Sequence, residues 1–432
     1  MSPIVISFLV AGVMSVLFLS GKLSFGLVTM SCAIFLVLTG VLTIPEAFAG
    51  FTNSTVIMIA SMFAVSAALQ KTSIPYRMSK LLDKVQSKNK LKLIVVILLV
   101  YMVMSIVIPD MISIALVVVF LQALPKDSGI SPKKMVIPLL MLAASWYMAV
   151  PVGMGATTDF LTNAFMQGVV PEGTPLLSYG STFLMRIPSI ICAFLYITFI
   201  CTKLPDPEEE LDASAVSSNG PAGSQLAKWQ EYIVYGAMIL IVAVLIGSSF
   251  IPVLSDLMWV IPAAAVCVFG FTNILSPKEI TGNLANGTVF MLAGILAVTA
   301  ALTKTGATEV LGNLLLPLIS WTNNGFIIIL ICCTFAAFMT TFLSNNGTAG
   351  VMIPLCSTMA VAAGMDPRSL AAAACMGAFF AFIFPSGSVT CAYAFSLSKA
   401  NPFKMLKYTL PLFVILVVFG SLGVYLVYPP FG

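Results

Sequence analysis

Four polar interruptions lie inside long apolar stretches of the sequence, and these are the places where chemistry could occur. They cover residues 109–113, 151–159, 344–348 and 385–390. Each break would free N–H groups at the start of one half-helix and C=O groups at the end of another. The N–H ends suit carboxylates and other anions, whereas the C=O ends and nearby side-chain oxygens suit a hard cation such as Na⁺. The pattern therefore predicts an anion site beside a cation site.

Single polar and charged residues in the apolar stretches differ in how strongly they indicate a function. Ser344, Asn345 and Asn346 are consecutive small polar residues in an apolar run, where they have no packing purpose. Asp110 and Asp159 are costly at membrane depth and are therefore functional candidates, unless each lies in water at the membrane edge. Arg186 lies near the outer end of an apolar span, where its side chain can reach the interface, so we expect a structural or lipid-facing role for it.

The composition limits what the elements around these residues can be. Hydrophobic residues make up 59% of the 432-residue chain, and charged residues only 8%, against about 25% in soluble domains. So few charges exclude a soluble enzyme, a disordered chain and a nucleic-acid binder. The chain has no His, which removes His-based catalysis and His-ligated metals, and its nine Cys form no C-x-x-C pair. We expect an all-α polytopic membrane protein in contact with the lipid bilayer.

The apolar stretches predict about ten transmembrane helices. Eight are uninterrupted, at about 3–20, 24–43, 54–70, 180–201, 230–250, 256–275, 286–302 and 406–428. Two more would be broken helices at 133–170 and 368–398, and the stretches 92–124 and 325–363 would be re-entrant hairpins. This arrangement puts the basic segment 71–92 and most other Lys residues in the cytoplasm, as the positive-inside rule requires. It also predicts that both termini are extracytoplasmic.

The two halves of the chain resemble each other. TVIMIASMFAVSAALQKTSI (55–74) aligns without gaps to TVFMLAGILAVTAALTKTGA (288–307), with about half of the positions identical. Each half would cross the membrane an odd number of times, so the second copy would be inverted, as in many secondary transporters. We expect a first inverted repeat at 1–202, a cytoplasmic linker at 203–229 that is rich in acidic residues, Ser and Pro, and a second inverted repeat at 230–432.

The interruptions also resemble those of the divalent anion/sodium symporter family, within the superfamily that includes citrate permeases. That family has a Ser-Asn-Thr motif at each hairpin tip, followed by small residues and a Pro. FLSNNGTAGVMIPL (342–355) matches it through Ser344 and Asn345. AFIFPSGSVTCA (381–392) is similar to the family's second helix break through Pro385 and Ser388, and VGMGATTDFL (152–161) is similar to the first through Gly155.

The resemblance implies the roles of the site residues. The expected ion-binding residues, with Na⁺ as the metal, are Ser344, Asn345, Pro385, Asp110, Gly155 and Asp159. The expected substrate-binding residues are Asn346, Thr348, Ser388, Thr157 and Thr158. The resemblance further implies a homodimer in which a transport domain moves against a fixed scaffold, as in an elevator mechanism.

The first hairpin tip departs from the family pattern. Pro109-Asp110-Met111 stands where Ser-Asn-Thr is expected. Asp110 could bind a cation, or it could carry a proton, because burial disfavours the charged form of a carboxyl group. A charged Asp110 would also repel an anionic substrate. The sequence therefore leaves open whether Na⁺ or H⁺ is the coupling ion.

We predict an ion-coupled secondary transporter of a prokaryotic plasma membrane that imports a small anion, a di- or tricarboxylate. The alternative is a cation/proton antiporter or an arsenite or oxyanion exporter of the same superfamily. Two membrane-depth Asp residues favour that alternative, as does the lack of an embedded Lys or Arg beside the hairpin tips. An enzyme with a cofactor is disfavoured, because no nucleophile is paired with a base.

Overall fold

The computed structural model describes most of the chain. The described residues are 2–20, 23–80, 89–123, 130–201, 203–204, 225–248, 251–307, 310, 317, 322, 324–342 and 344–431. Most of the predicted linker, residues 205–224, lies outside them. Within them the secondary structure is helical, with no strand, which confirms the predicted all-α class.

The helices fall into a first part before residue 203 and a second part after residue 225. The first part contains α1 (Pro3–Ser20), α2 (Phe25–Leu38), α3 (Ile44–Phe48), η1 (Ala49–Thr52), α4 (Ser54–Gln70), α5 (Ile74–Ser79), α6 (Lys90–Ser105), α7 (Asp110–Ala123), α8 (Pro132–Trp146), η4 (Gly153–Thr157), α9 (Thr158–Gln167) and α10 (Ser181–Ile200). The second contains α11 (Lys228–Gly247), α12 (Pro252–Phe271), α13 (Pro277–Leu284), α14 (Gly287–Lys304), α16 (Gly325–Thr340), α17 (Asn345–Ala362), α18 (Pro367–Ala378), η6 (Pro385–Gly387), α19 (Val389–Ser398) and α20 (Pro402–Val427).

Several helices begin at an asparagine cap that recurs in both parts. The side chain of Asn53 accepts hydrogen bonds from the first backbone N–H groups of α4, and Asn286 does the same for α14. Asn89 and Asn324 cap α6 and α16 in the same way. A capping side chain satisfies N–H groups that have no partner inside the helix, so these positions fix where each apolar run becomes helical.

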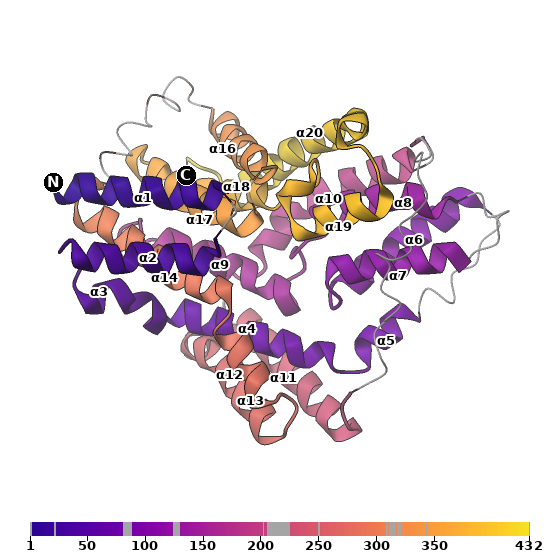
Figure 1. The fold of residues 1–432 in the computed structure, drawn as a ribbon, viewed down its shortest axis with the longest axis horizontal. Helices are drawn as coiled ribbons and strands as arrows, with labels where there is room; N and C mark the ends of the chain where they lie inside the picture. The colour runs from indigo at the N-terminus through magenta and orange to yellow at the C-terminus, as the bar shows by residue number, and fades with distance from the viewer. Residues whose placement is uncertain are drawn as a thin grey trace.

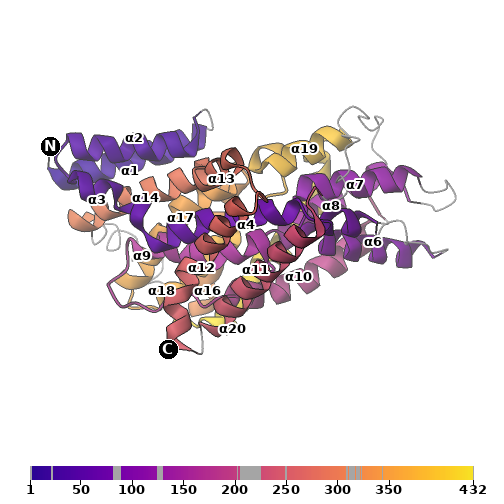
Figure 2. The ribbon, with the colours of Figure 1, turned by 90° about the horizontal axis from the view of Figure 1, so that it is seen from below.

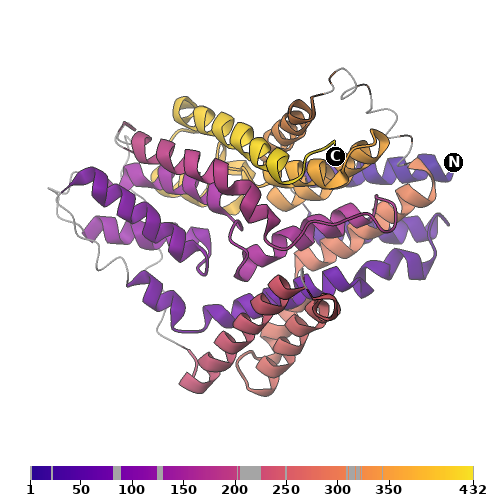
Figure 3. The same ribbon diagram turned by 180° about the vertical axis from the view of Figure 1, so that it is seen from behind.

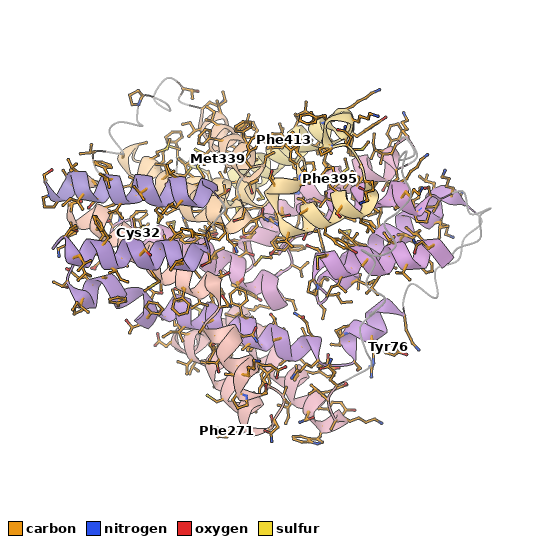
Figure 4. The ribbon with its side chains drawn as sticks, in the orientation of Figure 1. Cys32, Tyr76, Phe271, Met339, Phe395 and Phe413 are labelled. Carbon is orange, nitrogen blue, oxygen red and sulfur yellow. The ribbon has the colours of Figure 1, made fainter. Side chains whose placement is uncertain are left out.

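The chain has the apolar helices of an integral membrane protein. Among the described residues, four helical segments are long and apolar enough to cross a membrane, namely α10, α11, α13 with α14 (Pro277–Lys304), and α20. The bent pair Ile44–Thr52 and Ser54–Gln70 makes a fifth, with a 42° angle between its parts. Other predicted spans form shorter apolar helices, among them α2 (Phe25–Leu38) and the segment Asp256–Phe271 of α12. Outward-facing apolar side chains such as Phe271, at the end of α12, agree with a lipid environment (Figure 4).

Close helix pairs connect segments that are far apart in the sequence. α10 and α20 lie side by side (Figure 3), and the carbonyl group of Met185 approaches Gly423 so closely that a Cβ atom would not fit there. α2 packs on α14, and α12 packs on α4. Glycine permits such approaches between membrane helices because it has no side chain. The packing therefore joins the two parts of the chain into one body.

Two helix pairs and two interrupted helices occupy the four stretches for which the sequence predicts hairpins and broken helices. The first hairpin is α6–α7, and it lies at the right of Figure 1, whereas the second hairpin, α16–α17, lies toward the left. The view from below in Figure 2 agrees with this separation. The broken helices are α8–η4–α9 and α18–η6–α19, each interrupted by non-helical backbone. The arrangement leaves the two hairpin turns and the two breaks as the irregular segments that could build a site.

Candidate functional site

The turn of the first hairpin places a carboxylate at the start of a helix. α6 ends at Ser105, and α7 begins at Asp110. A carboxylate is favourable in the first turn of a helix, because the unpaired N–H groups give that end a positive potential. The side chain of Asp110 is nearly buried, and its Oδ1 accepts a 3.0 Å hydrogen bond from the hydroxyl group of Tyr101 on α6. This bond holds the carboxylate across the hairpin.

The turn of the second hairpin is fixed to the second broken helix. Ser344 caps α17 by accepting a hydrogen bond from the N–H of Gly347, at 3.2 Å. The hydroxyl group of Thr340 lies 3.1 Å from Oδ1 of Asn345 and 2.6 Å from the carbonyl oxygen of Ala378. Ala378 is the last residue of α18, and the second break begins after it. The amide group of Asn345 is therefore positioned, through Thr340, by the start of the second break.

The first break folds back on itself and on the first hairpin. After α8 ends at Trp146, the indole N–H of Trp146 donates a 2.9 Å hydrogen bond to the carbonyl oxygen of Met102 on α6. Met148 adopts a left-handed conformation, with φ of 51°. A Cβ atom at Gly155 would overlap the carbonyl oxygen of Val150, so only glycine fits this turn.

The second break is equally well defined. Residues 379–384 are not helical, η6 follows, and Ser388 caps α19 by accepting a 3.1 Å hydrogen bond from the N–H of Cys391. The hydroxyl group of Ser386 donates to the carbonyl oxygen of Thr341 at 3.1 Å. The break therefore rests on the end of α16, next to the turn of the second hairpin.

The two hairpin turns and the two broken helices meet at one cavity of about 300 Å³, which we call the central cavity. Its lining comes from both turns, the end of α8, the second break and α2: Phe25, Asp110, Leu140, Ala143, Ala144, Tyr147, Ser344, Asn345, Asn346, Phe379, Ala381, Ser388, Val389 and Thr390. A second cavity of about 270 Å³ lies between the first hairpin turn and the first break, and it shares Asp110, Tyr147 and Thr390 with the central cavity.

Helix ends of both polarities open into the central cavity. The first residues of α7, α17 and α19, which are Asp110, Asn345 and Val389, all line it. Tyr147, which follows the last residue of α8, lines it as well. Helix N-termini attract anions and a helix C-terminus attracts cations. The cavity can therefore hold both signs of charge close together.

The structure brings about half of the predicted site residues to these cavities. Asp110, Ser344, Asn345, Asn346 and Ser388 line the central cavity, and Gly155 lines the second cavity. The remaining predicted residues, Pro385, Thr348, Thr157, Thr158 and Asp159, line neither cavity. Thr158 donates to the carbonyl oxygen of Met148 at 3.0 Å, which stabilises the first break, and the hydroxyl group of Thr348 is buried without a hydrogen-bond partner among the described residues.

The geometry around Asp159 favours a structural role over the predicted ion-binding role. Its buried carboxylate accepts hydrogen bonds from the N–H of Gly180 at 2.7 Å, the hydroxyl of Ser181 at 3.0 Å, and both the N–H and the hydroxyl of Thr182 at 3.0 and 2.5 Å. Three of these bonds go to Oδ1 and one goes to Oδ2, so they use most of the lone pairs that would bind a cation. Asp159 instead holds the start of α10 against α9.

Arg186 is the functional candidate that the sequence interpretation undervalued. Its side chain is fully buried, so the expected lipid-facing position is wrong. One guanidinium nitrogen, Nη1, donates to the carbonyl oxygen of Tyr147, and the guanidinium carbon lies 5.6 Å from the ring centre of Phe379. Both of these partners line the central cavity. The sequence signal was a single Arg inside an apolar span, and its position on the helix was not enough to show which way it faced.

A family model described as "Citrate transporter" matches residues 15–428. The chain is 27% identical over 165 residues to an uncharacterised transporter of Haemophilus influenzae. The aligned region covers 38% of this chain and 36% of that protein. It is 29% identical over 152 residues to the sodium-dependent dicarboxylate transporter SdcS of Staphylococcus saprophyticus, with 35% of this chain and 29% of that protein covered. The matched segments therefore span about a third of the length of these relatives.

Human solute carrier family 13 member 1 is 26% identical over 185 residues, which cover 42% of this chain and 31% of that protein. Among solved structures, the fold is similar to the YdaH transporter of Alcanivorax borkumensis, whose crystal structure is described as having an unusual topology. The TM-score is 0.63 and the identity 13%, with 92% of this chain and 90% of that chain covered. This likeness concerns the fold alone.

Proposed function

The chain belongs to the citrate transporter family, and on this premise we propose that it is an ion-coupled secondary active transporter that imports a small anion with Na⁺. The family and the relatives are transporters rather than enzymes, in agreement with the prediction from the sequence. The relatives named as sodium-dependent dicarboxylate transporters support the predicted kinship with divalent anion/sodium symporters. They also support a di- or tricarboxylate as the substrate class.

The observation that carries this proposal is the composition of the central cavity. The N-termini of α7, α17 and α19 would attract the carboxylates of the substrate, with Asn346 and Ser388 as hydrogen-bonding side chains. Asp110, Ser344 and Asn345 line the same space, and their oxygen atoms are suitable ligands for a hard cation. One cavity thus has groups for both the anion and its coupling ion.

Asp110 supplies a reason why binding of the two ions would be coupled. Of the described residues that line the central cavity, Asp110 alone is charged. In a low-dielectric site its negative charge repels an anionic substrate strongly. A Na⁺ ion bound at Asp110 would cancel this repulsion, so each ion would raise the affinity for the other. Symport requires a mutual dependence of this kind.

We further propose that residues 1–202 and 230–432 are inverted repeats joined by the linker 203–229. Glu46 and Glu279 occupy equivalent positions when the alignment of the halves is extended without gaps, as do Lys71 and Lys304. Each Lys pairs with the Glu of the other half: Lys71 with Glu279 at 2.7 Å, and Lys304 with Glu46 at 2.7 Å. This reciprocal pairing is the pattern expected from a pseudo-two-fold axis in the membrane.

The same proposal extends to the mechanism and the assembly. Alternating access would come from an elevator movement of the hairpins and broken helices against a scaffold that contains the helices of the two ion pairs. The protein would be a homodimer in a prokaryotic plasma membrane, with both termini outside the cytoplasm. The separate packing of α2 on α14 and of α12 on α4 supports a rigid scaffold formed by both halves.

Uptake by the purified protein in proteoliposomes tests the proposed function. Radiolabelled succinate and citrate should accumulate inside the vesicles when Na⁺ is high outside, and accumulation should stop when the Na⁺ gradient is dissipated. An H⁺ gradient imposed in separate vesicles identifies coupling to protons. The absence of uptake of any carboxylate under either gradient would contradict the proposed function.

The buried position of Asp110 in the cavity also favours a second candidate, a cation/proton antiporter or an oxyanion exporter of the same superfamily. A carboxylate that alternates between a proton and a cation is sufficient for antiport. A pH jump across vesicles that contain no carboxylate separates the two functions. Release of protons in exchange for Na⁺ under these conditions supports antiport, whereas symport requires the carboxylate.

A further inference from the structure

Arg186 is a buried charged residue that is not among the proposed ligands of the ion or the substrate. It lies in α10 with no solvent-exposed surface, and its Nη1 donates to the carbonyl oxygen of Tyr147. Its Nε and Nη2 nitrogens have no hydrogen-bond partner among the described residues. Within the same described part of the chain, no carboxylate lies within 4.0 Å of its guanidinium group. The positive charge therefore has no contacting counter-ion among these residues, and Asp159 is a carboxylate within electrostatic range of it.

The surroundings of Arg186 connect it to the central cavity. Tyr147 follows α8 and Phe379 follows α18, so the two residues belong to the two broken helices. Their rings lie 5.7 Å apart and form part of the cavity lining. Because Arg186 contacts both of them, its guanidinium group lies directly behind this wall. Tyr147 is also within electrostatic range of Asp110, which is part of the same cavity lining.

We propose that Arg186 is the fixed positive charge that gives the central cavity its preference for multiply charged anions. This inference rests on the proposed function, because it concerns the charge of the transported substrate. Asp110 and Arg186 make a cavity that is close to neutral when no coupling ion is bound. When a cation occupies Asp110, the positive charge of Arg186 remains and attracts a dianion more strongly than a monoanion.

Two physical arguments favour this role over simple packing. A buried charge without a contacting counter-ion is costly at membrane depth, and an apolar side chain of similar length would fill the same space without that cost. The low dielectric of the interior also lets a charge behind one layer of side chains act strongly on the cavity. The hydrogen bond to Tyr147 and the contact with Phe379 keep the charge at a fixed distance from the wall.

Two substitutions of Arg186 separate charge from structure. Arg186→Gln removes the charge but keeps a donor for the carbonyl oxygen of Tyr147, and Arg186→Lys keeps the charge. In proteoliposomes, Arg186→Gln should raise the KM for radiolabelled succinate by about tenfold or more, with Vmax per reconstituted protein within about twofold of the wild type. Its preference for succinate over the monoanion monomethyl succinate, measured by competition, should fall to a similar extent. Arg186→Lys should retain the preference for the dianion.

Thermal unfolding of each purified variant with and without Na⁺ reports folding and the cation site without any anion. Wild-type KM and wild-type dianion preference in a folded Arg186→Gln protein would overturn the inference, and so would a loss in Vmax alone. If Arg186→Gln does not fold, the Arg186→Lys variant decides, since loss of the dianion preference there contradicts a role for the charge. If the wild-type protein itself transports no carboxylate, the proposed function fails, and this inference fails with it.

Discussion

Asn345 lies at the first turn of α17 and lines the central cavity, and its side-chain oxygen is held 3.1 Å from the hydroxyl of Thr340. We predict that Asn345→Ala weakens the binding of the coupling cation. Loss of one oxygen that contacts a charged group costs about 1.5 kcal/mol or more, which corresponds to about a tenfold higher half-saturating Na⁺ concentration. Succinate uptake measured against Na⁺ concentration gives this value directly.

Asn324→Ala is the matched control, because it makes the same deletion at an exposed residue that caps α16. It should cost about 1 kcal/mol of stability through the lost cap. Its Na⁺ dependence should equal that of the wild type. Unchanged Na⁺ dependence in Asn345→Ala as well would refute the assignment of Asn345 to the cation site.

For Asp159 we predict the opposite result, because its carboxylate oxygens accept hydrogen bonds from other residues of the fold. Asp159→Ala removes the acceptor of four hydrogen bonds at the start of α10. Unsatisfied buried donors should lower the free energy of unfolding by about 2 kcal/mol or more. The melting temperature of the purified protein should fall, whereas the half-saturating Na⁺ concentration should stay unchanged. A large shift in the Na⁺ dependence at normal stability would restore Asp159 as an ion ligand.

At this scale the sequence identifies the polar interruptions better than it predicts the direction of a single side chain. Ser344, Asn345 and Asp110 reach the cavity because each begins a helix at a hairpin turn, and a turn can be recognised from polar residues in an apolar run. Asp159 lies in the first turn of α9 and Arg186 lies in the interior of α10, and the direction of each side chain depends on packing with distant segments. Asp159 faces the start of α10, and Arg186 faces the two breaks. No local pattern contains that information.

Among the elements, the first broken helix depends on a close backbone approach that only glycine permits. Gly155→Ala would place a Cβ atom against the carbonyl oxygen of Val150, so residues 150–155 would have to move. Because this segment lines the second cavity together with Asp110, we predict a loss of transport of at least about tenfold and a destabilisation of about 1–3 kcal/mol. Uptake rates and thermal unfolding measure the two effects.

Gly282 in α13 offers a matched control for this substitution. A Cβ atom at Gly282 meets nothing within 4 Å. Gly282→Ala should therefore leave transport unchanged and stabilise the helix by up to about 1 kcal/mol. Equal activity in Gly155→Ala and Gly282→Ala would show that the first break does not need its close turn for transport.

Most element boundaries follow from the sequence because interruptions are clear in a strongly apolar chain. The predicted hairpin 325–363 corresponds to α16 and α17, and the predicted broken helix 368–398 corresponds to α18, η6 and α19. The lengths of individual spans were harder to predict. α2 covers Phe25–Leu38 within a predicted span of 24–43, since the helix ends at its C-cap Thr39 and the left-handed Gly40 follows. Local capping ended that helix earlier than its apolar pattern suggested.

For the whole molecule, the ion pairs Lys71–Glu279 and Lys304–Glu46 connect the two halves at equivalent positions. The sequence revealed the repeat through residues 55–74 and 288–307, but not the pairing between the halves, because partners so far apart depend on how the halves pack. If the halves are inverted, the two ion pairs lie on opposite sides of the membrane. Lys71–Glu279 would be cytoplasmic and Lys304–Glu46 extracytoplasmic.

Labelling of single cysteines in whole cells tests this arrangement. Thr281 in α13 lies near Glu279, and Thr39 follows α2 near the start of α3; both are exposed. In a chain with Cys192→Ser and Cys267→Ser, which removes the cysteines that are not buried, a membrane-impermeant maleimide should label Thr39→Cys in intact cells. Thr281→Cys should react only after the membrane is permeabilised. Labelling of both positions from the same side would contradict the inverted repeat, and with it the explanation of how two turns and two breaks from opposite halves reach one cavity.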